Sequence, residues 1–564
     1  MRNLIPPYGG ELPMLLVDAY RAQAIRQAAR DYPSIDLDWR QICDLELLLT
    51  GALAPLTGYL GRADYERVLS RLELSDGRFW PWPNVLAVPA KQAQGIVPGM
   101  TVALRDAEGF MPALLHVTEV WPADPERETR LAAESGLPLD QPTAAPGQVY
   151  LAGRVEGVSL PPRHDFLTLR LTPAEARAQF ARRGWRRVLA VMPTQPLHRP
   201  QHVFYLRAAA ECEANLFIHV AGGADPVHDP LHFTRLRACQ AMLPRFPATT
   251  TMMAVSPLLA SATGPRSVAY KAIVARNYGC THLVVGGESA PWGVPGGGVL
   301  GLALDAGQQA RLIEAVGVEL VAFPRLLYVE DQDTYLTEDD LPEGVRGLSM
   351  SDAELRRRLM QDLRVPEWYA YPEVVEELRK AHPPRHRQGF TVFFTGLSGA
   401  GKSTIARALA VKLMELGDRR VTLLDGDIVR KHLSSELGFS REHRDINIRR
   451  IGFVASEITK NGGVAICAPI APYRATRRDV RGMIEPWGGF IEVHVSTPIE
   501  VCEARDRKGL YAKARAGLIP EFTGVSDPYE VPESPELAID TSQYSVEEAV
   551  QKVVLKLEHE GYLR

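Results

Sequence analysis

Short apolar runs alternate with longer amphipathic segments in the C-terminal third of the chain. The first segment between two such runs, Ile405–Leu413, has the apolar spacing of a helix. Strands that alternate with helices favour a parallel sheet with helices on both faces. We therefore predict an α/β domain here, with strands at Phe390–Phe394, Val421–Leu424, Gly463–Ala468 and Gly489–Val495.

A second pattern of this kind lies upstream. Its apolar runs predict strands at Arg187–Met192, His282–Gly286 and Leu320–Phe323, and a short helical region follows at Ser351–Lys380. The glycines at 296–298 lack a strand before them and a helix after them, so they favour a loop over a dinucleotide-binding turn. The pattern predicts another α/β domain.

The remaining segments set the domain boundaries. The first 165 residues mix helical patches with short strands such as Val85–Val88 and Thr101–Leu104. Lys380–Gln388 is polar and contains prolines, which disfavours helix and strand and indicates a linker. We predict a first domain at 1–165, an α/β domain at 166–325, a small connecting domain at 326–380, the linker at 381–388 and a second α/β domain at 389–564.

Composition narrows the class of protein. The 564 residues include 46% hydrophobic and 23% charged residues, and the formal net charge is -4. This balance gives no reason to expect a nucleic-acid or membrane partner. The six cysteines are scattered without a Cys-x-x-Cys pair, which is typical of reduced thiols and not of disulfides or a zinc site. We expect a cytoplasmic, multidomain enzyme.

A complete phosphate-binding loop follows the strand at Phe390–Phe394. Residues 396–404 read Gly-Leu-Ser-Gly-Ala-Gly-Lys-Ser-Thr, and the predicted helix comes directly afterwards. Glycines let the backbone N–H groups converge on phosphate oxygens, the lysine reaches the β- and γ-phosphates, and the first hydroxyl holds Mg²⁺. An ordinary glycine turn is the alternative. We predict an ATP and Mg²⁺ site formed by Gly396, Ser398, Gly399, Gly401, Lys402, Ser403 and Thr404.

Two carboxylates follow the next strand. Ligands of an open α/β sheet collect at the carboxyl ends of its strands, where Asp425 and Asp427 are expected. Carboxylates there orient Mg²⁺ or accept a proton from an attacking hydroxyl. The strand at Val464–Cys467 has no acidic residue at its end. We therefore expect Asp425 and Asp427 to be catalytic with Lys402, and Ser403 and Asp427 to bind the metal; an Asx turn is the alternative.

Several separated motifs in this domain resemble the adenylylsulfate (APS) kinase family. The similarity runs from Gly389 to near the C-terminus. It rests on Asp425-Gly-Asp-x-x-Arg430, Leu437-Gly-Phe-Ser440, Arg444-x-x-Asn447-Ile-x-Arg450, Pro472-Tyr-Arg474, Arg505-Asp-x-Lys-Gly-Leu-Tyr511, Phe522-Thr-Gly524 and Asp527-Pro-Tyr-Glu530.

The resemblance implies transfer of the ATP γ-phosphoryl group to the 3′-hydroxyl of APS, giving 3′-phosphoadenylylsulfate (PAPS). Asp427 would orient or deprotonate that hydroxyl, and arginines would bind the phosphosulfate through charge-assisted hydrogen bonds. Two phenylalanines would sandwich the adenine, although either ring alone is more often core packing. The implied APS-binding residues are Arg430, Phe439, Arg444, Asn447, Lys508 and Phe522.

Two further features of the domain follow from the same resemblance. The basic run Arg505–Arg515 resembles a lid that closes over anionic substrates, although a charge run is often only a solvated face. Ala471 stands where many relatives have serine, so a phosphoserine at this position is impossible and direct in-line transfer is favoured.

Residues 1–380 resemble ATP sulfurylase (sulfate adenylyltransferase). The resemblance implies a β-rich domain followed by an α/β nucleotidyltransferase-like domain, upstream of a phosphate-loop kinase with a parallel sheet. It rests on Asp44-Leu-Glu-Leu47, Gly51-Ala-Leu-Ala-Pro-Leu-Thr-Gly58, Gly264-Pro-Arg266, Arg276-Asn-Tyr-Gly-Cys-Thr-His282 and Val365-Pro-Glu-Trp-Tyr369.

The sulfurylase motifs themselves have lost their cationic residues. In the family signature Gln-Thr/Ser-Arg-Asn-Pro-x-His-x-x-His the first histidine is kept as His198, and His202 is displaced by one position. The signature Gly-Arg-Asp-His-Ala-Gly has lost its arginine and histidine, and a third arginine is also replaced. The degenerate site comprises Thr194, Gln195, His198, Gln201, Ser261, Gly287 and Ser289.

These losses predict a catalytically silent sulfurylase-like domain. Sulfate attacking an α-phosphate needs cationic donors at the developing charge, and losing one donor typically costs about 10²–10³ in rate. Arg199 and Arg266 do not occupy the positions of the lost groups. The main hypothesis is therefore an APS kinase on a silent scaffold, the second is a bifunctional PAPS synthase, and the third is a nucleotide-binding regulator. Regulators of that kind lose the phosphate loop, which this chain retains.

We expect ATP and APS as small-molecule partners and, from the family, a homo-oligomer that is a dimer or a hexamer. The sequence leaves open what the silent domain binds. It also leaves open whether the kinase makes PAPS or consumes it to recover ATP.

Overall fold

The computed structural model describes residues 4–139, 141–223, 231–258, 264–286, 306–417, 419–438, 440–506 and 509–564. The chain forms two compact units. The first contains residues 1–356 and 364–381, and the second contains residues 357–363 and 382–564.

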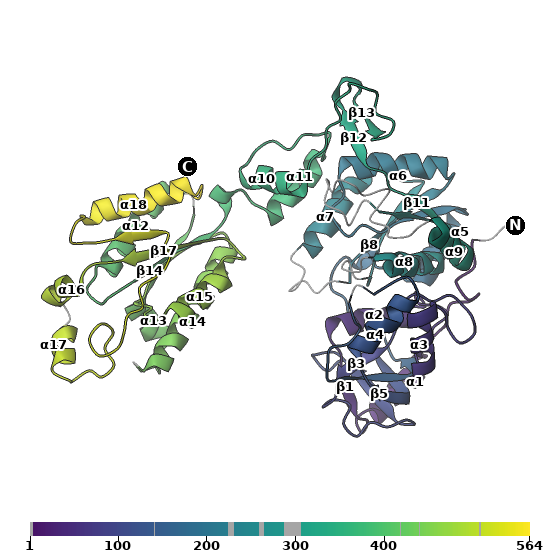
Figure 1. The fold of residues 1–564 in the computed structure, drawn as a ribbon, viewed down its shortest axis with the longest axis horizontal. Helices are drawn as coiled ribbons and strands as arrows, with labels where there is room; N and C mark the ends of the chain where they lie inside the picture. Colours follow the sequence, from purple (N-terminus) through teal and green to yellow (C-terminus); the bar gives the residue numbers. More distant parts are fainter. Residues whose placement is uncertain are drawn as a thin grey trace. The chain divides into compact units, whose positions relative to one another are not determined.

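The first unit begins with a β-rich domain built on a six-stranded sheet (Figure 1). The strand order is β1-β4-β5-β6-β2, and β3 also pairs with β6. All these pairs are antiparallel except β1 with β4. The strands are β1 (Ser34–Asp36), β2 (Gly58–Tyr59), β3 (Leu86–Pro89), β4 (Thr101–Arg105), β5 (Ala113–Pro122) and β6 (Gln148–Gly157). The helices are α1 (Ala19–Ala28), α2 (Trp39–Leu49), α3 (Arg62–Arg71) and α4 (Pro125–Glu134).

An α/β domain follows in the same unit, with five parallel strands in the order β11-β10-β7-β8-β9. These are β7 (Val188–Val191), β8 (Asn215–Ala221), β9 (Thr251–Ser256), β10 (His282–Val285) and β11 (Glu319–Ala322). The helices are α5 (Pro173–Arg182), α6 (Arg199–Glu211), α7 (His232–Met242), α8 (Gly264–Tyr278) and α9 (Ala306–Val316). Strands β7, β10 and β11 agree with the sequence prediction, whereas β8 and β9 were not predicted.

A small region follows at residues 326–381, of which residues 357–363 belong to the second unit. It contains the hairpin β12 (Leu326–Val329) and β13 (Thr334–Thr337), then α10 (Asp352–Met360) and α11 (Pro372–Ala381). The predicted helical region is thus two helices. Arg237 of α7 pairs with Glu377 of α11 at 3.0 Å, which ties this region to the α/β domain.

The second unit is an α/β domain whose five strands are all parallel, in the order β15-β16-β14-β17-β18. The strands are β14 (Phe390–Gly396), β15 (Val421–Asp425), β16 (Val464–Ala468), β17 (Gly489–Val495) and β18 (Leu537–Ile539). The helices are α12 (Lys402–Leu416), α13 (Gly426–His432), α14 (Arg441–Lys460), α15 (Arg474–Ile484), α16 (Ile499–Arg505), α17 (Leu510–Arg515) and α18 (Val546–His559).

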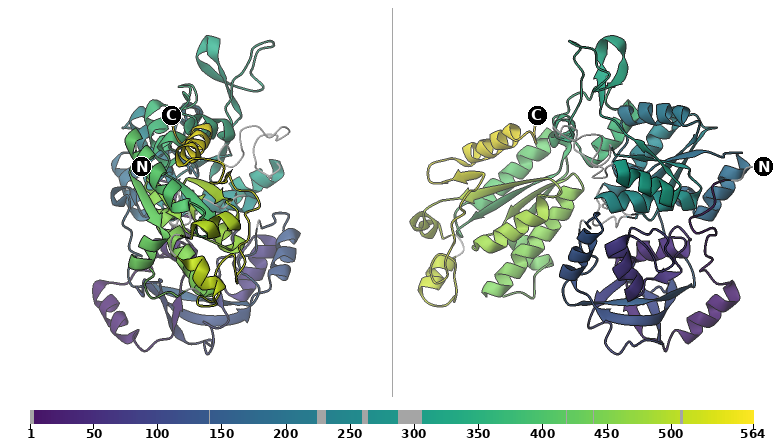
Figure 2. Two further views of the ribbon diagram at one scale, coloured as in Figure 1. Left: turned by 90° about the vertical axis from the view of Figure 1, so that its left-hand side faces the viewer. Right: turned by 45° about the vertical axis from the view of Figure 1, so that its right-hand side comes forward.

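Helices cover both faces of this sheet, as the sequence pattern predicts. Helices α12 and α18 lie on one side, and α13, α14 and α15 lie on the other (Figures 1 and 2). The side chains of β14 alternate between the two cores: Val392 and Phe394 pack with the first pair of helices, and Phe393 packs with α14 and α15. This sandwich holds the carboxyl ends of the strands rigidly at one edge, where the phosphate loop lies.

Candidate active sites

The phosphate loop connects β14 to α12 through glycines in conformations that other residues rarely adopt. Gly396, Gly399 and Gly401 have φ angles of 146°, 77° and 107°. A Cβ on Gly396 would lie 2.5 Å from the carbonyl oxygen of Val495 on β17. The loop can therefore curl only because these positions are glycine, and its backbone leads directly into the N-terminus of α12.

Lys402 begins α12 and folds back over the loop. It is 7% exposed, and its Nζ donates to the carbonyl oxygens of Gly396 at 2.9 Å and Leu397 at 2.7 Å. Ser403 and Thr404 follow in the first helical turn. An ammonium group held inside a glycine loop at a helix N-terminus fits the phosphates of a nucleotide, and Ser403 is the residue that would hold Mg²⁺.

The two predicted carboxylates lie in different elements. Asp425 is the last residue of β15, is 3% exposed, and has its Oδ2 3.4 Å from Nη2 of Arg407. Helix α13 begins at Gly426, so Asp427 belongs to its first turn. The side chain of Asp427 lies outside the described part of the structure. Both residues remain candidates at the carboxyl edge of the sheet.

Arg444 and Asn447 lie in α14 and are both buried. Nη1 of Arg444 donates to Oγ1 of Thr523 at 2.7 Å and to Oδ2 of Asp527 at 2.9 Å, and Nη2 donates to the carbonyl of Glu521 at 3.0 Å. Among the described residues, neither Nε of Arg444 nor Oδ1 of Asn447 has a hydrogen-bond partner. Because buried polar atoms are normally paired, these two atoms indicate a place for a polar ligand.

The other residues predicted to bind APS are placed only in part. Arg430 donates from Nη1 to the carbonyls of Leu437 at 3.3 Å and Gly438 at 3.1 Å, and so holds the loop before α14. Phe522 is half-buried, with its ring centre 5.1 Å from that of Tyr511. Phe439 and Lys508 lie outside the described residues.

The predicted lid, Arg505–Arg515, begins at the last residue of α16 and ends with α17, and it contacts the phosphate loop. The hydroxyl of Tyr511 on α17 donates to the carbonyl of Ser398 at 2.9 Å. Arg505 at the end of α16 donates from Nη1 to Oγ1 of Thr541 at 2.7 Å. The region is thus attached to the phosphate loop through side chains that the sequence motif already contains.

Asp527 and Tyr473 are two site residues to which sequence reasoning assigned no role. The hydroxyl of Tyr473 donates to Oδ2 of Asp527 at 2.8 Å, the same oxygen that accepts from Arg444. Burial and the Asp527 carboxylate raise the pKa of Tyr473 to about 12. Both residues belong to quoted motifs, but their connection appears only in the folded chain.

In the first unit, His198, the histidine retained in the predicted degenerate site, makes contacts that stabilise the fold. His198 precedes α6, and its backbone N–H donates to Oε1 of Gln201 at 3.1 Å. The His198 ring stacks on Tyr369 at 4.6 Å, and burial lowers the pKa of His198 to about 4. Both residues thus support the start of the helix. Thr194 is buried and Gln195 is exposed, while Ser261, Gly287 and Ser289 lie outside the described residues.

Comparisons with known proteins cover the whole chain. Family models match as a PUA-like domain at residues 5–160, ATP-sulfurylase at 168–381 and adenylylsulphate kinase at 388–540. Proteins called sulfate adenylyltransferase from Phaeosphaeria nodorum and Emericella nidulans are each 42% identical, over 99% of this chain and 99% of their own length. The chain belongs to the ATP sulfurylase/APS kinase family.

A solved structure of this family extends the similarity to three dimensions. It is described as a hexameric APS kinase from Thiobacillus denitrificans, is 48% identical and has a TM-score of 0.84. The match covers 100% of this chain and 99% of that one. The predicted family and its mixed α/β fold, with a parallel-stranded kinase domain, are therefore confirmed. None of the described helices is long and apolar enough to cross a membrane.

Arg266, from the third ATP sulfurylase motif, serves the fold of the first unit. It is 1% exposed, and burial lowers its pKa to about 10. Its guanidinium donates to Ser135 Oγ at 2.9 Å and to the carbonyls of Val68 (3.2 Å), Leu69 (2.6 Å), Pro81 (3.1 Å), Ala132 (3.4 Å) and Leu137. A guanidinium with this many carbonyl partners joins β-rich and α/β domains and is not directed at a substrate.

Arg199 and His202 of α6 also bind other groups of the protein. Arg199 reaches the carbonyl of Glu367 at 3.4 Å and Asp333 at 3.3 Å. His202 lies 3.0 Å from the hydroxyl of Tyr371 through Nδ1, so the displaced histidine of the family signature contacts the small region after the hairpin.

Arg235 is a buried cation near the sulfurylase-like site that sequence reasoning missed. It lies on α7, is 3% exposed, and donates from Nη1 to the carbonyl of Thr194 at 3.3 Å. No motif in the sequence distinguishes it from the other arginines of the chain. Its position next to Thr194 comes only from the packing of α7.

Proposed function

We propose that the second unit is an adenylylsulfate kinase, which transfers the ATP γ-phosphoryl group to the 3′-hydroxyl of APS and forms PAPS. The observation that carries the proposal is the combination of two features. One is the glycine loop with Lys402 folded inside it. The other is the buried pair Arg444 and Asn447, whose Nε and Oδ1 lack partners among the described residues. The description of the related APS kinase supports it.

Each residue has a role that its chemistry supports. Lys402 neutralises charge on the phosphoryl group in transfer, and Asp427 orients or deprotonates the 3′-hydroxyl. Arg444 and Asn447 bind the APS. Arg430 and Phe522 lie around it. Mg²⁺, held by Ser403 and Asp427, supplies charge compensation on the phosphates when bound. The sequence assignments of Phe439 and Lys508 to APS are kept as part of the proposal.

We propose further that the sulfurylase-like region is catalytically silent. The lost cations of its signatures are not replaced by Arg266 or Arg199, because both arginines are occupied elsewhere. Gln201, at the spacing of a family histidine, caps α6 instead.

The second candidate is a bifunctional PAPS synthase that also makes APS from sulfate and ATP. The name sulfate adenylyltransferase of relatives that match the whole chain favours it. The buried Arg235 beside Thr194 is a cation near this site that the second candidate would use.

Parallel assays on the purified protein test both candidates. One follows ATP-dependent conversion of APS to PAPS, and the other follows sulfate-dependent release of pyrophosphate, with pyrophosphatase present. We expect PAPS formation and no sulfate-dependent pyrophosphate. Activity in both assays would establish the bifunctional enzyme and refute the silent site.

Lys402→Met provides the control for the kinase assay. It should lower kcat for PAPS formation by about 10²–10³, because it removes the cation at the transferring group. A Lys402→Met protein with wild-type kcat would contradict the proposed site.

We also propose a homo-oligomer, a dimer or a hexamer. The related APS kinase is described as hexameric and matches this chain over its full length.

A further inference from the structure

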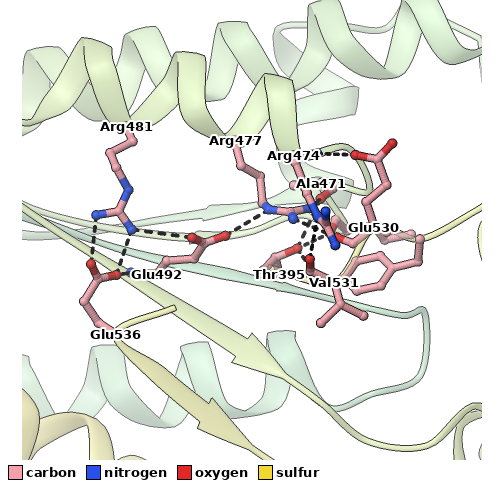
Figure 3. Close-up of polar contacts among 11 residues, drawn as sticks. Thr395, Ala471, Arg474, Arg477, Arg481, Glu492, Glu530, Val531 and Glu536 are labelled. Carbon is pink, nitrogen blue, oxygen red and sulfur yellow. Dashed lines mark hydrogen bonds and ion pairs between the residues drawn. The ribbon is translucent and has the colours of Figure 1, made fainter. Parts of the chain in front are cut away.

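Three arginines of α15 point from the helix toward the strands and the segment that follows the lid (Figure 3). Arg474, Arg477 and Arg481 recur at intervals that place them along one side of the helix. Arg474 is exposed, whereas the side chain of Arg477 is 4% exposed. A buried arginine needs a specific partner for each of its groups.

Arg477 finds these partners in three different parts of the second unit. Its Nη1 donates to the carbonyl of Ala471 at 2.6 Å, and its Nη2 donates to the carbonyl of Glu530 at 2.7 Å. Its Nε lies 2.9 Å from Oε1 of Glu492 on β17. The planar guanidinium therefore fixes the spacing of two backbone segments, while the carboxylate compensates its charge.

The first of these segments is the turn after β16. Ala471 has a φ angle of 45°, a left-handed conformation that costs energy for a residue with a side chain. The preceding carbonyl, of Ile470, accepts from Oγ1 of Thr395 at 2.7 Å and from the N–H of Gly396 at 3.3 Å. The strained turn thus adjoins the start of the phosphate loop.

The second segment, Asp527–Glu530, carries the carboxylate that holds Arg444. Two other side chains of the segment are also bonded: Oε2 of Glu530 accepts from the backbone N–H of Arg474 at 2.8 Å, and the hydroxyl of Tyr529 lies 2.9 Å from Oγ1 of Thr395. An open cavity of about 630 Å³ separates the segment from the loop after β17. The bonds of Arg477 and Tyr529 hold the segment on its other side.

We propose that Arg477 is a positioning residue for APS. It holds the Ala471 turn and the Asp527–Glu530 segment at a fixed separation, and through Asp527 it sets the orientation of Arg444. The role rests on the proposed kinase function. Arg477 binds the segment whose Asp527 holds Arg444. Lys402 and Arg505, on the proposed ATP side, bind other groups. Loss of Arg477 should therefore affect APS more than ATP.

Arg481 offers a matched control on the same helix. Within the described residues its ion pairs are with Glu485 (3.1 Å), Glu492 (3.4 Å) and Glu536 (2.8 Å). It shares Glu492 with Arg477, but none of these ion pairs reaches the Ala471 turn or the Asp527–Glu530 segment. A role limited to charge balance and stability would make the two arginines equivalent.

The test compares Arg477→Lys, Arg477→Gln and Arg481→Gln in the full-length protein. We expect both Arg477 variants to raise KM for APS about ten- to hundredfold, because a lysine keeps the charge but has all its donors on one nitrogen, which cannot span the carbonyls of two separate segments as a guanidinium does. KM for ATP should stay within about threefold of wild type in all three variants. Arg481→Gln should lower the melting temperature and leave KM for APS within the same range.

Unchanged KM for APS in the Arg477 variants, or an equal increase in Arg481→Gln, would overturn the positioning role. If both Arg477 variants melt below the assay temperature, Tyr529→Phe decides, since it removes the bond from the Asp527–Glu530 segment to Thr395, whose Oγ1 in turn donates to the carbonyls of Ile470 and Ala471. An increase in KM for APS of about fivefold supports the role, and no change overturns it. A wild-type protein without APS-dependent ADP formation would instead refute the proposed function itself.

Discussion

Buried arginines and histidines of this chain differ in what their polar atoms meet. Arg266 directs its donors to backbone carbonyls, and Arg444 divides its donors between backbone, side chains and an open position at Nε. The first arrangement stabilises the fold, and the second leaves an atom for the proposed ligand. A residue type alone does not separate these roles, because the separation depends on the partners.

His219 on β8 belongs to neither class and makes the first unit sensitive to acid. It is 0% exposed, neither ring nitrogen has a partner among the described residues, and burial lowers its pKa from 6.5 to about 3. The unfolded chain therefore binds a proton more readily than the folded chain. The free energy of unfolding should be highest above pH 6.5 and fall as the pH drops from 6.5 toward about 3.

His219→Leu tests this at the level of one residue. The leucine removes a buried group without a partner, so the melting temperature near about pH 7 should be unchanged or higher. The decrease in melting temperature between about pH 7 and about pH 5 should be smaller than in wild type, although His198 still contributes. His164→Leu, at an exposed position, is the control. Equal acid sensitivity in wild type and His219→Leu would contradict the argument.

At the scale of elements, β14, the phosphate loop and α12 all depend on the glycine conformations of the loop. The sequence predicts the strand and the helix, and the structure extends the helix back to Lys402 because Gly401 adopts a left-handed φ of 107° directly before it.

Strands β8 and β9 of the first unit were not predicted from the sequence. They are parallel and almost wholly buried, so their residues show no alternation, and a short apolar run of this kind also suits a buried helix.

Gly396→Ala is the corresponding prediction for the loop. The new Cβ would lie 2.5 Å from the Val495 carbonyl, so β14 and β17 must separate at the phosphate loop. We expect a loss of ATP binding, measured by calorimetry, and a lower melting temperature. Gly482→Ala in α15 is the control, since its Cβ meets no atom within 4 Å, and it should be neutral or stabilising by about 0.5–1 kcal/mol. Wild-type ATP affinity in Gly396→Ala would refute the geometric argument.

At the scale of the whole molecule, the chain passes between its two units more than once. Residues 357–363 belong to the second unit, where Asp362 pairs with Arg564 at 2.8 Å, although residues 364–381 return to the first. The predicted boundaries at 380 and 388 remain predictions. Because we propose that the sulfurylase-like region is silent, we assign it a role in assembly.

Removal of residues 1–380 tests that role. If the first unit carries the contacts of the higher-order assembly, the remaining kinase should have a smaller subunit count in light scattering than the full-length protein. Its melting transition, followed in parallel, shows whether it is folded. A folded truncated kinase with the full-length subunit count would refute the assembly role.

The sequence by itself determined the family, the mixed α/β fold with a phosphate-loop kinase, and the contiguous motifs, because a loop such as 396–404 carries its chemistry within nine neighbouring positions. Only the tertiary structure decided what the separate charged residues do. Arg266 meets the carbonyl of Val68, 198 positions away, and Arg477 meets that of Glu530, 53 positions away. Every residue type has a backbone carbonyl. The pattern of side chains along the chain therefore does not predict which carbonyls an arginine will bind.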